Sequence, residues 1–396
     1  MASKDMLALG SQASVIRDLF AYGQQQAAVV GKENVFDFSI GNPTVPAPDC
    51  VKESIKQIVD TRESVAVHGY TAAAGDSAVR KGLAEYMNTT YAANVRADNF
   101  YMTCGAAASL TITLKALVEQ PDDEVIVVAP FFPEYTVFIA NAGAKEVILP
   151  PDTVDFQISL QAMAQAITPH TRAVIVNSPN NPSGTVYSAE TYGKLAVLLT
   201  QKSAEIGHTI YLIADEPYRE IIYDDLPILY VPHFYGSTIV CYSYSKSLSL
   251  PGERIGYILV PDCVDGSHDV YTAICGAGRA MGFVCAPHLF QDVVLQCLGQ
   301  TSDVSLYDHN RTLLYGALKK MGYQCVYPSG AFYLFVKSPE PDANAFSEKA
   351  KALNVLIVPA DSFGCPGYVR ISYCVDADMI SRSLPAFQKL MDSYKK

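Results

Sequence analysis

The sequence predicts an α/β protein with a large domain, in which helices sandwich a mostly parallel central sheet, and a smaller α+β domain. Two observations predict this class. Short apolar runs bounded by turn residues recur through the middle of the chain, and stretches with leucines at helical spacing separate them. The 396 residues, of which 49% are hydrophobic and 17% charged, are enough for two or three domains with a sizeable core.

Continuous apolar runs of this kind are typical of strands that are buried on both faces, as in a parallel sheet. Residues 104–119 and 188–205 have the leucine spacing of helices. The predicted strands are VIVVAP (125–130), EVILP (146–150), AVIVNSP (173–179), IYLIADEP (210–217) and TIVCYSYS (238–245).

The two ends of the chain have a different pattern. The first 49 residues contain one amphipathic helix and then the Pro/Gly-rich passage FDFSIGNPTVPAP. A helical stretch at about 287–320 precedes further strand-like runs, among them YVRISYCV. We therefore expect an N-terminal segment (1–49) that joins the small domain, a large domain (50–288) and a small C-terminal domain (289–396).

Charge and cysteine usage exclude several functions. With 29 Lys and Arg against 40 Asp and Glu, the net charge is −11, which disfavours nucleic acid or a membrane surface as the main partner. The ten cysteines show no C-x-x-C spacing, and we see no metal-binding constellation. No apolar run approaches the ~18 residues of a spanning helix. We expect a cytoplasmic protein without a metal.

The segment SYSKSLSLPGERIG (243–256) carries the most informative residues. Lys246 follows a predicted strand, and a lysine amine can attack an aldehyde. Ser243, Ser245 and Arg254 offer hydroxyls and a guanidinium to an oxyanion such as phosphate. A solvated lysine beside a structural arginine is the alternative interpretation.

Three further clusters follow predicted strands, where α/β proteins bind ligands. In IADEPYRE (213–220), Asp215 could bond a cationic ring nitrogen and Tyr218 a ring oxygen. In NSPNNPSG (177–184), Asn181 could donate to a phenolic oxygen. In TCGAAASLTI (103–112), small residues open a helix whose N-terminus suits a phosphate. Taken alone, the first cluster is better explained by a helix N-cap and a packed tyrosine, and the second is a weak signal because Asn and Pro turns are common. Tight strand–helix packing explains the third cluster as well as a phosphate site does.

Taken together and in this order, the four clusters resemble the class I/II aminotransferases, which are fold-type-I pyridoxal phosphate enzymes of the aspartate aminotransferase kind. The resemblance implies pyridoxal 5'-phosphate as the cofactor, with Lys246 as its covalent attachment and the proton carrier. It implies that Asp215 pairs with the pyridine nitrogen and that Asn181 and Tyr218 bond the ring oxygen. The implied phosphate ligands are Ser243, Ser245, Arg254 and the backbone of Gly105, Ala106 and Ala107.

The same resemblance implies roles for positions outside these clusters. Phe132 would stack on the cofactor ring, with Phe131 as the alternative. Arg370 would bind the substrate α-carboxylate, and Gly41 and Asn181 would also contact substrate. Tyr70 would reach the phosphate site of a neighbouring subunit, so the resemblance implies a homodimer.

The leading functional hypothesis is an aminotransferase that moves an amino group from an amino acid to a 2-oxo acid in a ping-pong sequence. We expect aspartate or glutamate as the donor and 2-oxoglutarate as the acceptor, with Arg279 as the candidate for the distal carboxylate. Ala107 stands where one aspartate-specific branch has a lysine. The alternatives are an aromatic or neutral amino donor, a carbon–sulfur lyase or a decarboxylase on the same scaffold, and a non-catalytic binding protein.

Overall fold

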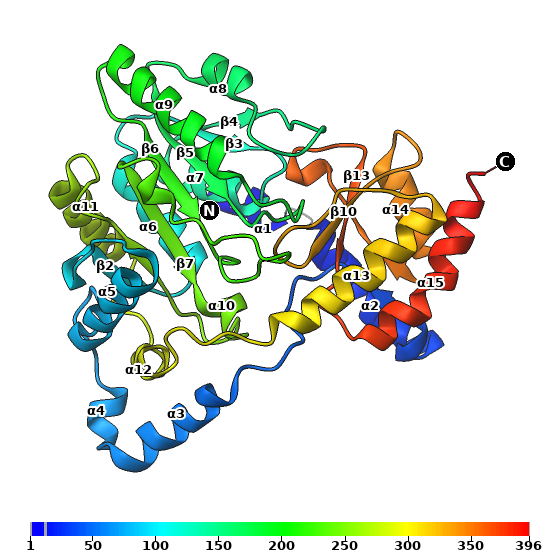
Figure 1. The fold of residues 1–396 in the computed structure, drawn as a ribbon, viewed down its shortest axis with the longest axis horizontal. Coiled ribbons are helices and arrows are strands. Elements are labelled where there is room, and N and C mark those ends of the chain that lie inside the picture. The colour runs from blue at the N-terminus through cyan, green and yellow to red at the C-terminus, as the bar shows by residue number, and fades with distance from the viewer. Residues whose placement is uncertain (1, 12–13, 396) are drawn as a thin grey trace. The chain divides into compact units, whose positions relative to one another are not determined.

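Figure 1 shows a computed structural model of the chain, which describes residues 2–11 and 14–395. These residues form two compact units. The large unit comprises residues 43–306 and 329–331, and the small unit comprises the described residues up to 42 together with 307–328 and 332–395. The domain boundaries expected after residues 49 and 288 stay a prediction.

A seven-stranded sheet in the order β2-β8-β7-β6-β5-β3-β4 is the centre of the large unit. Neighbours from β7 to β4 are parallel, whereas β8 runs antiparallel to both β2 and β7. The mostly parallel sheet confirms the predicted α/β class. The strands are β2 (Phe100–Thr103), β3 (Glu124–Val128), β4 (Lys145–Leu149), β5 (Thr171–Asn177), β6 (Tyr211–Asp215), β7 (Thr238–Ser243) and β8 (Gly256–Leu259).

Helices cover both faces of this sheet (Figure 1). Successive strand side chains point to opposite faces, so Val125 and Val127 pack on one side and Ile126 and Val128 on the other. The first face packs against α6 (Ala106–Leu117), α7 (Glu134–Ala142) and α11 (Ser267–Ala280). The second packs against α5 (Ser77–Tyr91), α8 (Leu160–Ala166), α9 (Ala189–Ile206) and α12 (His288–Gln296).

Local sequence signals set the ends of these helices. Asp76 caps α5 by accepting hydrogen bonds from the backbone N–H groups of Ala78 and Val79. Ser188 caps α9 in the same way, and α9 ends at Gly207, whose φ of 82° suits glycine. The remaining helices of the large unit are α3 (Asp49–Thr61), α4 (Ser64–His68), the short α10 (Tyr244–Ser247) and the 3-10 turns η2 (Ala97–Asn99) and η3 (Val231–His233).

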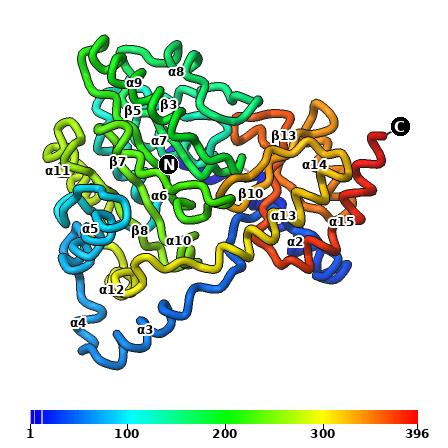
Figure 2. Tube along the Cα trace, viewed as in Figure 1, coloured from blue at the N-terminus to red at the C-terminus, as the bar shows by residue number. Residues whose placement is uncertain are grey.

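The small unit combines segments from both ends of the chain, which lie side by side in Figures 1 and 2. Its antiparallel sheet has the order β12-β13-β10-β9, and β1 pairs in parallel with β11. The strands are β1 (Phe36–Asp37), β9 (Gln324–Cys325), β10 (Tyr333–Lys337), β11 (Val355–Leu356), β12 (Val358–Pro359) and β13 (Tyr368–Ser372). The helices are α1 (Lys4–Ser11), α2 (Val15–Val30), α13 (Val304–Met321), α14 (Ala343–Lys351), α15 (Ala377–Asp392) and the turns η1 (Lys32–Asn34) and η4 (Asp361–Phe363).

Two of the predicted helical stretches are divided differently in the structure. The N-terminal segment contains two α-helices, α1 and α2, rather than one. The stretch predicted at about 287–320 is broken into α12 and α13, because Gly299 between them adopts a φ of 76° that no α-helix accommodates. Within residues 2–11 and 14–395, no helix is both long enough and apolar enough to cross a membrane.

Candidate active site

Polar side chains gather where β5, β6 and β7 end. Asn177 is the last residue of β5 and lies opposite Asp215, the last residue of β6, and Asp215 lies opposite Cys241 of β7. Ser243 is two residues beyond Cys241 and therefore points to the same face of the sheet. This face is the one covered by α6 and α7. The strand register thus brings together three clusters that are separate in the sequence.

A cradle formed by Gly105, Ser243, Ser245 and Arg254 lies at one end of this row. Gly105 precedes α6 with a φ of 87°, and a Cβ atom there would stand 2.7 Å from Nη2 of Arg254 and 3.5 Å from Oγ of Ser243. Ser243 Oγ is 2.8 Å from Ser245 Oγ, and Arg254 Nη1 donates to Ser245 Oγ at 3.4 Å. The first-turn N–H groups of α6 have no acceptor within the helix. A guanidinium, two hydroxyls and a helix N-terminus therefore converge on one point.

At the other end of the row, Asp215 is held by two neighbours. The hydroxyl of Tyr135 donates to its Oδ2 at 2.5 Å, and Asn177 Nδ2 donates to its backbone carbonyl at 2.9 Å. Its second carboxylate oxygen, Oδ1, is buried and accepts no hydrogen bond from any residue that the structure describes. Burial raises the pKa of Asp215 to about 7, against the lowering effect of the Tyr135 hydrogen bond and with a further increase from Glu216.

The loop after β5 and the helix α10 supply the other predicted residues. The backbone N–H of Asn181 donates to Asn177 Oδ1 at 2.8 Å, which fixes the loop beside the end of β6. Asn181 and Tyr218 are buried, whereas Phe132 and Lys246 are half-buried. Lys246 lies in α10, whose N-cap is Ser243, so the lysine and the two serines of the cradle belong to one turn.

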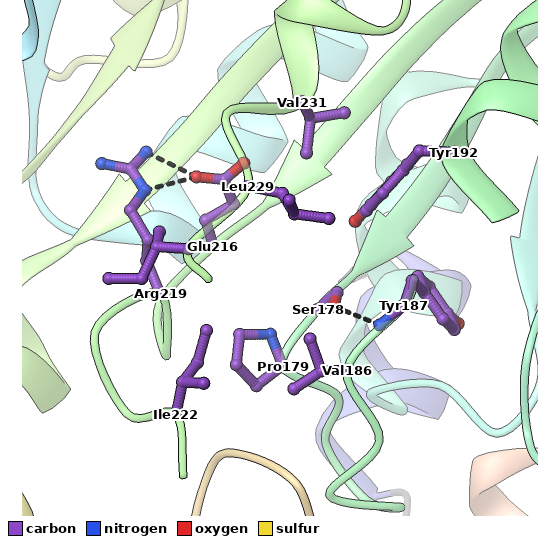
Figure 3. Close-up of a pocket in the computed structure, with 11 residues that line it drawn as sticks. Ser178, Pro179, Val186, Tyr187, Tyr192, Glu216, Arg219, Ile222, Leu229 and Val231 are labelled. Carbon is purple, nitrogen blue, oxygen red and sulfur yellow. Dashed lines mark hydrogen bonds and ion pairs between the residues drawn. The ribbon is translucent and has the colours of Figure 1, made fainter. Parts of the chain in front are cut away.

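A second carboxylate beside Asp215 points the other way. Glu216 follows Asp215 directly, so the pleat turns its side chain to the opposite face, where it forms an ion pair with Arg219 at 2.5 Å (Figure 3). Figure 3 shows this pair at the edge of a cavity of about 20 Å³, which is room for one water molecule. Arg219 also donates to Tyr257 at 2.9 Å and lies over the Tyr242 ring. This pair was not predicted, although the Glu-x-x-Arg spacing was an available sequence signal.

Four predicted residues lie elsewhere. Gly41 and Arg370 belong to the small unit. The Arg370 guanidinium is buried between the rings of Tyr333 and Phe363, whose centroids are 4.8 and 5.1 Å from its central carbon. Tyr70 lies just after α4 and is 88% exposed, and Arg279 is exposed in the last turn of α11.

The described residues of the large unit fit pyridoxal phosphate at both ends. The cradle matches a phosphate monoester, because it offers a guanidinium, hydroxyls and backbone N–H groups, and Gly105 leaves its centre clear. The unsatisfied Oδ1 of Asp215 matches a protonated ring nitrogen, which is the donor that a buried carboxylate oxygen lacks. Lys246 provides an amine on the turn that carries Ser243 and Ser245.

Comparisons with known proteins agree with this chemistry. The model of the family "Aminotransferase class I and II" matches residues 33–387. An aspartate aminotransferase from Thermotoga maritima is 29% identical over 93% of this chain and 94% of its own length. A solved amino transferase from Eubacterium rectale has a TM-score of 0.99 and 57% identity, with both chains fully covered. Aspartate aminotransferase from Thermus thermophilus, solved with maleate, has a TM-score of 0.86 and 25% identity over 98% of this chain and all of that chain.

The chain belongs to the class I and II aminotransferases. It is a pyridoxal phosphate-dependent aminotransferase, as its sequence motifs predicted.

Proposed function

We propose that this enzyme transfers the amino group of aspartate or glutamate to a 2-oxo acid such as 2-oxoglutarate, in a ping-pong sequence that depends on Lys246. The observation that carries the proposal is the row of groups on one edge of the sheet: the cradle around Gly105, the amine of Lys246 and the unsatisfied Oδ1 of Asp215. When bound, the cofactor withdraws electrons from the substrate Cα, and the protein supplies orientation and charge.

Each residue of the row has a distinct task in this proposal. Lys246 would hold the cofactor through its amine, and the neutral amine would take the Cα proton of the substrate. Asp215 would hold the ring nitrogen in its protonated form, and Phe132 would pack on the ring. Asn181 and Tyr218 would bond the ring oxygen. The phosphate would be held by Ser243, Ser245, Arg254 and the N–H groups of Gly105, Ala106 and Ala107.

Substrate binding is assigned to Arg370, Gly41 and Asn181. Arg370 binds the α-carboxylate, because its planar guanidinium suits a two-point contact. Its position is fixed within the small unit, where Nη2 donates to the Ser39 carbonyl at 2.6 Å and two aromatic rings enclose it. Gly41, two residues after Ser39, and the amide of Asn181 are the other proposed substrate contacts.

The proposed active form is a homodimer in the cytoplasm. Tyr70 supports the dimer, because a tyrosine that is 88% exposed has little packing within its own chain. In the proposal it reaches the phosphate of the partner's cofactor. An interface of this kind typically buries at least ~2,000 Å².

The choice of a dicarboxylic donor rests on Arg279. Its exposed position at the end of α11 leaves the guanidinium accessible to the distal carboxylate of a substrate held by a second subunit. The relatives named aspartate aminotransferase, one of them solved with the dicarboxylate maleate, support this choice. An aromatic or neutral donor is the second candidate. It is favoured by Phe131 and Phe132, whose rings both pair with the ring of Tyr135.

Reductive labelling tests the assignment of Lys246. Borohydride treatment of the loaded enzyme should fix the cofactor to the peptide that contains Lys246, and Lys246→Ala should lose both the label and transamination. Lys145→Ala, which changes an exposed lysine at the start of β4, is the matched control and should keep both. A label on another lysine would refute the assignment.

Steady-state kinetics test the substrate. We expect Arg279→Ala to lower kcat/KM for aspartate by the equivalent of about 2–5 kcal/mol and to leave kcat/KM for alanine almost unchanged. Phenylalanine is the third donor, and equal losses for all three donors would contradict the role of Arg279. Product formation without any 2-oxo acid acceptor would instead favour a lyase or a decarboxylase.

A further inference from the structure

A hydrogen bond from Tyr135 makes the two oxygens of the buried Asp215 carboxylate different from each other. Tyr135 lies in the first turn of α7 and is almost fully buried. Its hydroxyl donates to Oδ2 at 2.5 Å, and Asn177 Nδ2 stands 3.5 Å from the same atom. Oδ1 is equally buried but has no hydrogen-bond partner within the described part of the chain. The protein thus fixes one oxygen and leaves the other for a donor that it does not itself provide.

Packing holds the Tyr135 ring in place. The Phe131 ring lies nearly parallel to it at 6.5 Å between centroids, and the Phe132 ring meets it edge-on at 5.8 Å. Tyr135 also belongs to the core cluster that contains Leu110 and Ile139. A ring enclosed on several sides cannot swing its hydroxyl away, so the direction of the bond to Asp215 is set by the core of the large unit.

Electrostatics give this hydroxyl a second effect. Burial opposes the charged form of Asp215 and raises its pKa, and the negative charge of Glu216 acts in the same direction. The hydrogen bond from Tyr135 acts against both by favouring the carboxylate. Among the causes that shift this pKa, it is therefore the one that keeps Asp215 available as an anion.

We propose that Tyr135 is a positioning residue for the cofactor: it anchors Oδ2 of Asp215 so that the ionised Oδ1 faces the ring nitrogen. Asp215 must pair with that nitrogen for Tyr135 to act in this way, so the inference rests on the proposed function. The competing explanation is a structural one, in which the hydroxyl merely finds the nearest acceptor in the core. The two explanations predict different effects of Tyr135→Phe on cofactor binding and on the protonation of the ring nitrogen.

Tyr135→Phe is the decisive variant, because it keeps the ring and removes only the hydroxyl. We expect cofactor binding to the apoenzyme, measured by titration, to weaken by about 10- to 100-fold, as expected for the loss of a hydrogen bond to a charged group. We expect kcat to fall and KM for the amino donor to stay unchanged, since Arg370 is untouched. With cofactor labelled with ¹⁵N at the ring nitrogen, NMR should show a larger neutral fraction in the variant than in wild type.

Tyr235→Phe is the matched control. Its hydroxyl is buried in the same unit and donates to the carbonyl of Ile210 at 2.7 Å, so its removal costs a comparable hydrogen bond away from Asp215. We expect a similar loss of urea stability in both variants but normal cofactor affinity and a normal ¹⁵N spectrum in Tyr235→Phe. Equal cofactor affinity in the two variants would overturn the positioning role and favour the structural one.

A second experiment, in the Asp215→Asn variant, distinguishes a failure of this inference from a failure of the proposed function. In Asp215→Asn, which no longer carries the charge, adding Tyr135→Phe should change the cofactor affinity no further. If Asp215→Asn weakens binding and Tyr135→Phe does not, only the positioning role fails. If Asp215→Asn binds the cofactor like wild type, the proposed pairing of Asp215 fails, and the role of Tyr135 fails with it.

Discussion

The buried carboxyl of Asp215 should make the stability of the apoenzyme fall as the pH rises. Its pKa is raised from the ordinary 3.8 to about 7, chiefly by burial. In the folded apoenzyme the carboxyl therefore keeps its proton at a pH where the unfolded chain has released it. The stabilising effect is complete below the unfolded value and is lost as the pH rises through the folded value. The difference between the two values corresponds to about 4 kcal/mol.

Asp215→Asn provides the reference, because the amide does not titrate. We would measure urea unfolding of the apo forms of wild type and variant from pH 4 to pH 8 and follow the difference in unfolding free energy. Wild type should lose up to about 4 kcal/mol relative to the variant across this range, with most of the loss below pH 7. Bound cofactor should flatten the curve, because its ring nitrogen gives Oδ1 a positive partner. A difference curve that stays level within about 1 kcal/mol would refute the reasoning.

Three other predictions concern single positions. Gly105→Ala would place a Cβ 2.7 Å from Arg254 Nη2 at a φ of 87°, so it should lower stability by about 1–2 kcal/mol in urea unfolding and weaken cofactor binding at least tenfold. Arg370→Lys should raise KM for the amino donor roughly tenfold or more in steady-state assays, because lysine lacks the planar fork, while cofactor titration stays normal. The Tyr70→Ala and Lys246→Ala proteins should each be inactive alone. After mixing and subunit exchange, half of the dimers should be mixed and should carry one complete site out of two, so about a quarter of wild-type activity should return. No recovery after subunit exchange would contradict a shared site.

Five strands of the large sheet could be predicted, because the apolar run that indicates each strand lies within its own residues. Each predicted run, such as 173–179 and 238–245, overlaps an observed strand. Four of these strands are almost entirely buried and therefore apolar nearly throughout. The fifth, β4, lies at the edge of the sheet and is partly exposed. The antiparallel β8 was not predicted. Its four residues, Gly256–Leu259, begin at the last residue of the segment SYSKSLSLPGERIG and show no alternation of their own. Only the pairing with β2 and β7 makes them a strand.

The candidate site was predictable to a similar degree. Motifs placed Asp215, Ser243 and Lys246 at strand ends, and the observed register brings the first two to one face of the sheet. No sequence motif indicated that Tyr135 holds Asp215. Its bond to Asp215 joins residues 80 positions apart, and no spacing within either segment indicates it. Contacts of this kind depend on how α7 packs on the sheet, which a single sequence does not encode in a readable pattern.

The reversed direction of β8 has a consequence for how the enzyme acquires its cofactor. Gly256 stands opposite both Thr103 and Ser243, and a Cβ there would lie 3.0 Å from the Cα of Gly105. The cradle therefore exists only after segments about 150 residues apart have paired, which is a slow step in the assembly of a sheet. A chain still on the ribosome, or a partly folded one, has not yet assembled the cradle. The cofactor should therefore bind only when β8 has paired with β2 and β7. Free pyridoxal phosphate should raise the yield of refolding, because it stabilises chains in which this pairing has formed.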